Sequence, residues 1–166
     1  MDAIFNRKSI RKYKDIKVSD EIVNYLLKAA MQAPSAGNEQ PWEFIVLRDK
    51  DVMKKITEVH PYSKMLLEAD VAIVVCGDES KEVFKGFWVQ DCSAATENIL
   101  IAAEDKGLGA VWLGVYPHMD RTEAIKGILN LPDSVIPLSI IPVGYPDEQK
   151  EAADRFKKER IHYDRW

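Results

Sequence analysis

Apolar and polar residues follow two different spacings along this chain, and these predict helices and strands in succession. Positions three and four residues apart are apolar in four segments, which we predict to be helical: residues 19–33, 49–59, 87–106 and 121–130. Ser19 is suited to cap the first helix and Pro34 to end it. The longest segment, 87–106, has many small side chains that favour close packing against another helix, and Gly107 follows as its cap.

Four runs of apolar residues predict strands, over residues 43–48, 71–76, 110–115 and 135–144. Six consecutive apolar residues in the second run indicate burial on both faces of a sheet. Pro137 and Pro142 cannot donate hydrogen bonds within a sheet, so we expect parts of the last strand at an edge or a bulge. Beyond Gly144 the chain turns charged and weakly helical. The pattern predicts a single α/β domain with about four strands and flanking helices.

Composition narrows the class of protein but does not indicate its chemistry. The chain has 166 residues, of which 46% are hydrophobic and 30% charged, as expected of one soluble domain with a substantial core. The net charge of −4 gives no electrostatic reason to bind nucleic acid or an acidic membrane. No apolar run approaches the roughly 20 residues that span a bilayer. The N-terminus also lacks the apolar stretch of a signal peptide, so we expect a cytoplasmic protein.

Several familiar catalytic motifs are missing from the sequence. The glycine pair in 107–109 follows a helix and precedes a strand, which is the reverse of the order in a dinucleotide-binding turn. There is no P-loop and no nucleophile elbow. The three histidines lie far apart without ligand spacing, so we expect no bound metal. Cys76 and Cys92 are expected to be buried thiols, and Cys92 lies on an apolar helical stripe.

One segment near the N-terminus, Arg7-Lys8-Ser9-Ile10-Arg11, is unusually basic. Arginine supplies planar forked donors and serine one more, so the segment could clamp a phosphate. A basic, solvated surface segment explains the same residues. The residues themselves leave both interpretations open.

The segment from 33 to 44, APSAGNEQPWEF, is the second unusual stretch. Pro34, Gly37 and Pro41 suit a turn between a helix and a strand, and Asn38 also tolerates positive φ. The amides of Asn38 and Gln40 are then left without a role. Each offers both a donor and an acceptor, which is what contact with the edge of a heteroaromatic ring requires. A plain turn and a ligand-contacting loop both remain possible at this point.

Taken together and in this order, the two segments resemble the nitroreductase-like FMN family. Further matching motifs are WVQD at 88–91, GLGAVWLG at 107–114, VGYP at 143–146 and the tail that contains Arg155. The resemblance extends over essentially the whole chain. It implies an α+β fold, with a central mixed or antiparallel sheet flanked by helices, in an intertwined homodimer. Residues 1–166 would form one FMN-binding domain, with the tail from about 145 to 166 packed on the partner subunit.

The resemblance also implies which residues bind FMN, two molecules of which would lie at the subunit interface. The phosphate would be held by Arg7, Lys8 and Ser9, with Arg155 as a further partner. Arg11 would lie near the N1/O2 edge of the flavin, where a positive charge stabilises the reduced, anionic form. The backbone of Leu113 and Gly114 would lie beside the ring and offer an amide near N5.

A second set of residues would reach the same flavin from the other subunit: Pro34, Ser35, Asn38 and Gln40. Tyr62, Phe87 and Trp88 are candidate walls of the substrate pocket, although core packing explains each of them equally well. The segment 78–87 is expected to be a brief loop where larger members carry extra helices, which leaves the pocket more open or completed by the partner.

The activity implied is that of an FMN-dependent NAD(P)H oxidoreductase. NAD(P)H would give hydride to flavin N5 and leave, and an electron-poor acceptor such as a nitroaromatic, quinone or enone would then take the electrons. Because the cofactor performs the chemistry, the protein need not supply an acid, base or nucleophile. Leu113 replaces an acidic residue of some members, which keeps open an FMN-binding storage, sensor or electron-transfer protein. A flavin-consuming or dehalogenating relative is a further alternative, although Leu113 offers no hydroxyl near N5.

Overall fold

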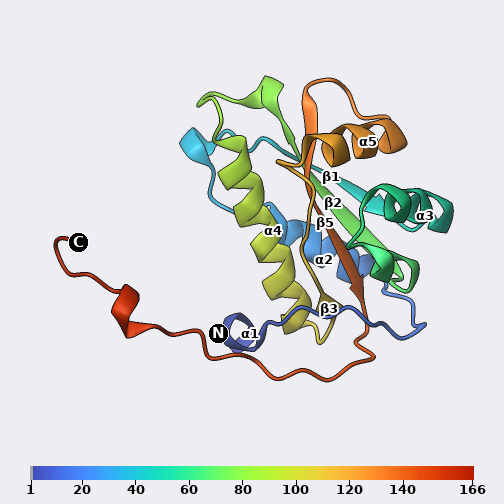
Figure 1. The fold of residues 1–166 in the computed structure, drawn as a ribbon, viewed down its shortest axis with the longest axis horizontal. Helices are drawn as coiled ribbons and strands as arrows, with labels where there is room; N and C mark the ends of the chain where they lie inside the picture. The colour runs from blue at the N-terminus through green and yellow to red at the C-terminus, as the bar shows by residue number, and fades with distance from the viewer. Residues whose placement is uncertain (1) are drawn as a thin grey trace.

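Helices pack on both sides of one sheet in the computed structural model, which describes residues 2–166 (Figure 1). In chain order the helices and strands are α1 (Asp2–Asn6), α2 (Asp20–Ala30), β1 (Trp42–Leu47), α3 (Lys50–Val59), β2 (Val71–Asp78), α4 (Trp88–Asp105), β3 (Gly109–Ala110), β4 (Leu113–Gly114), α5 (Met119–Leu129) and β5 (Val135–Gly144). Short 3₁₀ turns lie at Ala36–Asn38, Lys64–Leu67, Glu79–Lys81 and Lys158–Arg160. Within this range, none of the helices has both the length and the apolar character needed to cross a membrane.

The sheet is antiparallel in every strand pair, in the order β1-β2-β5-β3, with β4 also paired to β5. Antiparallel pairing makes the fold α+β, as the resemblance implied. β5 is an interior strand, because it pairs with β2 on one side and with β3 and β4 on the other. Of the two positions expected for its prolines, an edge or a bulge, the edge is therefore not the one found. The expected bulge is present: the register shifts between Val75 and Cys76, opposite Ser139 and Pro137.

Pro142 fits in this interior strand because the facing strand is interrupted there. The predicted strand 110–115 is two short pieces, β3 and β4, which pair with Val143 and Ile140 on either side of Pro142. The carbonyl of Pro142 points to this side, where it accepts a hydrogen bond from the Tyr13 hydroxyl at 3.3 Å. In an antiparallel strand the amide nitrogen points the same way as the carbonyl. The missing N–H of Pro142 therefore faces the gap between β3 and β4, where no strand requires it.

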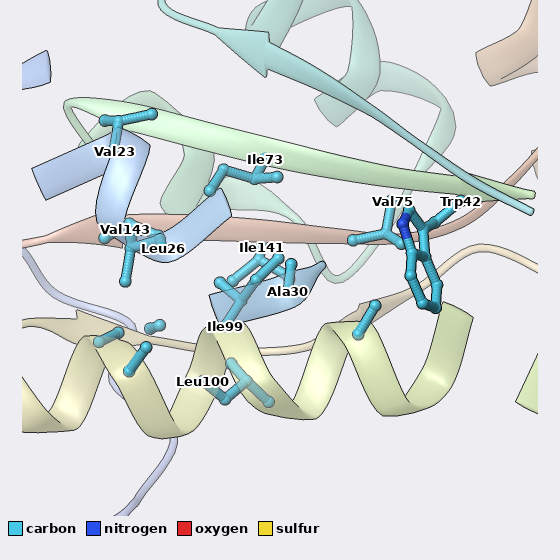
Figure 2. Close-up of a cluster of buried hydrophobic side chains, with 14 of the residues drawn as sticks. Val23, Leu26, Ala30, Trp42, Ile73, Val75, Ile99, Leu100, Ile141 and Val143 are labelled. Atoms are coloured by element: carbon cyan, nitrogen blue, oxygen red, sulfur yellow. The ribbon is translucent and has the colours of Figure 1, made fainter. Parts of the chain in front are cut away.

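The sheet is covered on both faces, which explains the unbroken apolar run in β2. Val71, Ile73 and Val75 belong to the core under α2 and α4, while Ala72, Val74 and Cys76 belong to the core under α3 and α5. Figure 2 shows the first of these cores, with side chains of α2 and α4 meeting those of the strands. Alternate residues of one strand thus serve two separate cores.

Local signals in the sequence set the ends of the main helices. The Ser19 hydroxyl accepts a hydrogen bond from the Ile22 amide at 3.3 Å, which confirms its capping of α2. Gly107 follows α4 with φ of +68°, a conformation that glycine adopts without strain. The small residues of α4 do bring it close to α2, where the Asn98 side chain donates to the Ala29 carbonyl at 3.0 Å.

The C-terminal tail first follows the N-terminal segment and then leaves the body of the protein (Figure 1). Backbone hydrogen bonds join Lys14 to Tyr145 and Asp147 to Lys12, at 2.8 and 2.9 Å. From residue 151 onward every residue is exposed, and the only regular structure is the turn at Lys158–Arg160. The expectation of weak helicity was wrong, because no apolar face of this tail is packed against its own chain.

Candidate functional site

The main candidate site is a cavity of 720 Å³ beside β4. It is lined by the segment 60–62 after α3, by residues 111–114, and by Arg11, His118 and Arg121. Its volume lies within the roughly 300–1,000 Å³ of small-molecule sites. Arginines and histidines line it and no carboxylate of the described residues does, so the cavity suits an electron-rich or anionic ligand edge.

Two side chains meet at one backbone carbonyl in this cavity. The carbonyl oxygen of Gly114 accepts a hydrogen bond from His60 Nε2 at 3.0 Å and from Arg121 Nη1 at 2.6 Å. His60 Nδ1 accepts a hydrogen bond from the Tyr62 amide at 3.3 Å. Burial, together with the charge of Arg121, lowers the pKa of His60. The histidine is therefore neutral with its proton on Nε2, because Nδ1 must accept.

Gly114 also leaves room for a flat ligand. No atom of the described chain lies within 4 Å of the position that a Cβ would take on this residue. Arg11 and the backbone of Leu113 and Gly114 line the same cavity, so the structure brings together three of the residues expected around a flavin. A ring could lie against this backbone with a cation near its edge, which fits the donors that an isoalloxazine requires.

The other residues of the basic segment lie against α4 and β3 rather than in the cavity. Arg7 Nε lies 3.3 Å from the Glu97 carboxylate, and Lys8 Nζ lies 3.0 Å from that of Glu104. Ser9 forms a backbone bridge with Ala110 of β3. The side chains of both cations are about a quarter exposed, at 21% and 27%. A phosphate here would compete with α4 carboxylates for these side chains.

Arg155 lies in the exposed tail, in a hollow with Ile4 and Phe5 of α1. The structure therefore does not bring it into the β4 cavity. Ion pairs fix Arg7 and Lys8 to the body of the protein, whereas no ion pair is found for Arg155 within residues 2–166.

The loop between α2 and β1 forms a separate hollow. Pro34 and Ser35 line a space of 310 Å³ with Phe87 and Gln90 at the start of α4. Gly37, Asn38 and Gln40 have positive φ angles of 53°, 59° and 48°, which confirms the expected turn at Gly37 and Asn38.

The polar side chains of this loop are exposed and bond one another. Gln40 Nε2 donates to Asn38 Oδ1 at 2.8 Å, and the Gln40 amide donates to the Ser35 hydroxyl at 3.1 Å. Their amides are held side by side at the surface of this chain. No described residue lines both this hollow and the β4 cavity, so one chain alone does not unite the two sets.

A carboxyl pair under this loop was not anticipated. Asp91 is buried, and its Oδ1 accepts a hydrogen bond from the Ala36 amide at 3.0 Å. Glu39 Oε2 accepts from the amides of Val83 and Phe84 at 2.6 and 2.9 Å. The remaining oxygens, Asp91 Oδ2 and Glu39 Oε1, are buried without another partner among the described residues.

The Glu39 carboxylate lies near enough to Asp91 to oppose its ionisation. Burial raises the pKa of Asp91, while the amide hydrogen bond from Phe84 holds the pKa of Glu39 below its usual range. The pair therefore joins the loop, the segment after β2 and the first turn of α4. Its only sequence signal is one acidic residue among the apolar positions of α4.

The aromatic candidates divide between site and core. Tyr62 is exposed and lines the β4 cavity, and Phe87 lines the hollow of the α2–β1 loop. Trp88 is buried against Gly77 and contacts the Tyr116 ring edge-on with 5.0 Å between centroids, so it is a core residue. Cys76 and Cys92 are buried free thiols, as expected, and burial raises the pKa of Cys76 to about 12.

The fold and the cavity together define an α+β protein with a small-molecule site beside the end of β4. The nitroreductase family matches over residues 4–60 and 57–145. A protein of Methanothermobacter thermautotrophicus, provisionally named NADH dehydrogenase/NAD(P)H nitroreductase, is 52% identical over 166 residues, which is 100% of this chain and 87% of that protein. The chain belongs to the nitroreductase family.

Solved structures agree with this assignment. An FMN-dependent nitroreductase of Clostridium difficile R20291 superposes with a TM-score of 0.92 at 32% identity, over 100% of both chains. A provisionally named nitroreductase of Desulfovibrio desulfuricans, solved in complex with FMN, has a TM-score of 0.86 at 30% identity. That match covers 99% of this chain and 96% of the other.

Proposed function

We propose that this protein is an FMN-dependent NAD(P)H oxidoreductase. The observation that carries the proposal is the β4 cavity, which is lined both by an unobstructed glycine backbone and by Arg11. The names of relatives support it: a Bacillus subtilis protein named FMN reductase [NAD(P)H] is 26% identical over 179 residues. The FMN complex of the Desulfovibrio desulfuricans structure supports the choice of cofactor.

The residues of this chain fit FMN in two regions. Leu113 and Gly114 offer backbone beside the ring, and Arg11 offers a cation at its edge. The phosphate, with about two negative charges, would draw Arg7 and Lys8 away from their α4 carboxylates, with Ser9 and Arg155 as further partners. When bound, FMN supplies the hydride-accepting and hydride-donating centre at N5. The protein positions substrates and tunes charge around that centre.

The assembly we propose is a homodimer in which each α2–β1 loop reaches the other subunit's cavity. Pro34, Ser35, Asn38 and Gln40 lie together on one loop, separate from the β4 cavity of their own chain. The tail carries exposed apolar side chains, with Phe156 at 71% and Trp166 at 100% exposure. Packing of this tail on the partner subunit would cover them.

We propose that NAD(P)H and the electron acceptor use the same place in turn. Tyr62, which lines the cavity, is 72% exposed, so the cavity is open on this side. An open, aromatic-lined cavity favours flat, electron-poor acceptors such as nitroaromatics, quinones or enones.

The decisive experiment is the reaction of the purified, FMN-loaded protein with NADH and NADPH in the absence of oxygen. Bleaching of the flavin absorbance by either nicotinamide, followed by recovery on adding a quinone, is the expected result. Flavin that stays oxidised with both would overturn the proposal and favour a binding or electron-transfer protein. A preparation that takes up no FMN on titration would contradict the cofactor itself.

A further inference from the structure

We propose that His60 and Arg121 are positioning residues, which fix the Gly114 peptide in the orientation that a bound flavin requires. The inference rests on the proposed function and deepens it. It starts from the fact that both side chains donate to one carbonyl oxygen, His60 at 3.0 Å and Arg121 at 2.6 Å. We call these two donors and their shared acceptor the Gly114 clamp.

The Gly114 peptide needs these two hydrogen bonds because a glycine by itself restrains the backbone very little. A glycine at this position keeps the space beside the backbone empty, since no atom of the described chain lies within 4 Å of a Cβ placed there. Glycine is also the residue with the greatest backbone freedom. It ends β4, a strand of only two residues, so the sheet restrains it weakly. Room for a flat ligand and a fixed peptide are therefore in conflict unless other groups hold the peptide.

His60 supplies a donor with only one possible direction. Its side chain is almost completely buried, with 2% of the residue exposed. Nδ1 accepts from the Tyr62 amide at 3.3 Å, so Nε2 must carry the proton that goes to Gly114. A neutral ring with both nitrogens in use cannot flip without losing two hydrogen bonds. His60 therefore sets both the carbonyl of Gly114 and the backbone of Tyr62.

Arg121 approaches the same oxygen from the first turns of α5. No ion pair with a carboxylate is found for it within residues 2–166, and its Nε is buried without a partner there. Leaving a guanidinium unpaired and partly buried costs free energy. The hydrogen bond that it does form goes to Gly114. We infer that this loss of free energy is offset by a functional gain, namely a fixed orientation of the Gly114 peptide.

The clamp joins two elements that are distant in sequence. His60 ends α3, and Arg121 lies in α5, on the same side of the sheet, where α3 and α5 share one core. The Gly114 peptide is thus held against both helices, and its position does not depend on the short β4 pairing alone.

The test compares variants that remove each donor with variants that keep one. His60→Leu and Arg121→Met remove the donors, whereas His60→Gln retains a nitrogen donor near the position of Nε2 and Arg121→Lys retains a cation. Lys55→Met, on the exposed face of α3 and away from the cavity, is the control for loss of a polar side chain. We expect His60→Leu and Arg121→Met to slow flavin reduction by NAD(P)H about 10- to 100-fold, the size of effect that small misplacements produce. His60→Gln should stay within about threefold of the wild type.

Two further measurements separate positioning from simple stability. Amide hydrogen exchange of residues 113–116 in the FMN-free protein should be faster in both donor-removing variants and normal in His60→Gln and Lys55→Met. The flavin midpoint potential should shift in the same two variants.

Unchanged exchange and unchanged reduction rates in His60→Leu and Arg121→Met would overturn the clamp. The same holds if His60→Gln is impaired as much as His60→Leu, because packing alone would then explain the histidine. A wild-type protein that takes up no FMN would instead contradict the proposed function, while the exchange measurement on the FMN-free protein would still test whether the clamp holds Gly114.

Discussion

At the residue scale, Gly114 and Gly37 differ in the space that surrounds the position of a Cβ atom. Beside Gly114 there is open space, whereas a Cβ on Gly37 would lie 2.4 Å from the Phe84 ring, and Gly37 also has φ of +53°. Gly37 is therefore required by the protein's own packing. Gly114 is not, so only a ligand in the adjoining cavity would be obstructed by a side chain there.

The first prediction follows for Gly114→Ala. The FMN-free protein should keep its stability to within about 0.5 kcal/mol, because the new methyl group meets no atom of the described chain. FMN affinity should fall about tenfold or more, because the methyl group occupies the space proposed for the ring. Thermal unfolding without FMN and flavin fluorescence titration measure the two effects. Equal FMN affinity in the variant and the wild type would contradict a flavin at this backbone.

Gly37→Ala should show the opposite pattern. An alanine with positive φ and a contact at 2.4 Å forces the α2–β1 loop or Phe84 to move. We expect the FMN-free protein to lose about 1–2 kcal/mol of stability. Urea unfolding of this variant beside Gly114→Ala measures the contrast, and an unchanged midpoint would show that the loop is loosely packed.

The carboxyl pair under the same loop makes stability depend on pH. Burial raises the pKa of Asp91 in the folded protein, so the folded state binds this proton more tightly than the unfolded state does. The resulting stabilisation is present at low pH and is lost as the pH rises from about 4 through the raised pKa.

We therefore predict that Asp91→Asn becomes increasingly stabilising as the pH rises. The introduced side-chain amide can donate to Glu39 and accept from Ala36 at every pH, so it does not have to ionise. The free energy of unfolding of variant and wild type, measured between about pH 5 and about pH 8, gives the difference. Asp133→Asn at an exposed position is the control. A constant difference across this range would argue against a raised pKa of Asp91 in the folded protein.

At the scale of elements, a buried pair of hydroxyl groups joins α4 to the sheet. The Thr96 hydroxyl donates to the Cys92 carbonyl at 2.8 Å and lies 3.0 Å from the Ser139 hydroxyl of β5. Both Thr96 and Ser139 are completely buried. The core around this contact is otherwise built from apolar and small side chains, so the hydroxyl pair sets the position of the helix along β5.

Thr96→Val should destabilise the protein by about 1–3 kcal/mol, because it leaves the Ser139 hydroxyl buried without a partner. The double variant Thr96→Val/Ser139→Ala should recover much of this loss, since it removes both polar groups. Chemical unfolding of the two single variants and the double variant gives the coupling free energy. Additive losses would mean that the hydroxyls do not depend on each other.

The helices were the part of the structure that the sequence predicted best. Ser19, Asp49 and Gly107 mark helix ends, and α2, α3 and α4 lie within a few residues of their predicted ranges. The interruption between β3 and β4 was missed because the run 110–115 is almost uniformly apolar and only pairing with β5 shows the gap. The interior position of Pro142 could not be recognised for the same reason: its free side is created by a break in a different strand.

The candidate site could be predicted only in part from the sequence. Arg11 and the Leu113–Gly114 backbone were found through the family motifs, and the structure does place them in one cavity. His60 and Arg121 could not be found, because their shared contact is a backbone carbonyl, which leaves no pattern in side-chain spacing. Some expected roles depend on a second subunit and stay predictions, namely those of Pro34, Ser35, Asn38, Gln40 and Arg155.

At the scale of the whole molecule, the C-terminal tail exposes large apolar side chains that its own chain does not cover. Its backbone is bonded to the N-terminal segment as far as Asp147, and Lys150 still contacts the Ser9 carbonyl at 3.0 Å. Beyond that point, Phe156, Tyr163 and Trp166 are more than two-thirds exposed, at 71%, 80% and 100%. Apolar side chains of this size in one segment are typical of an interface.

Truncation after Lys150 should therefore weaken the proposed dimer and leave the fold of the subunit intact. We expect a lower molecular mass in light scattering at low micromolar concentration, a normal far-ultraviolet circular dichroism spectrum apart from the missing tail, and reduced FMN retention. Replacement of Phe156, Tyr163 and Trp166 by serine in the full-length chain is the matched variant. A dimer that survives both changes would show that the tail is not part of the interface.

The burial of both thiols also has a practical consequence for studying that tail. Cys76 and Cys92 lie inside the core with raised pKa values, so neither presents a thiolate to a reagent in the folded protein. A cysteine introduced at an exposed tail position, for example by Glu151→Cys, would be the only thiol that a maleimide spin label or dye can reach in the native state. Distances between the two labels of an assembled pair would then report directly where each tail lies, without any replacement of the native cysteines.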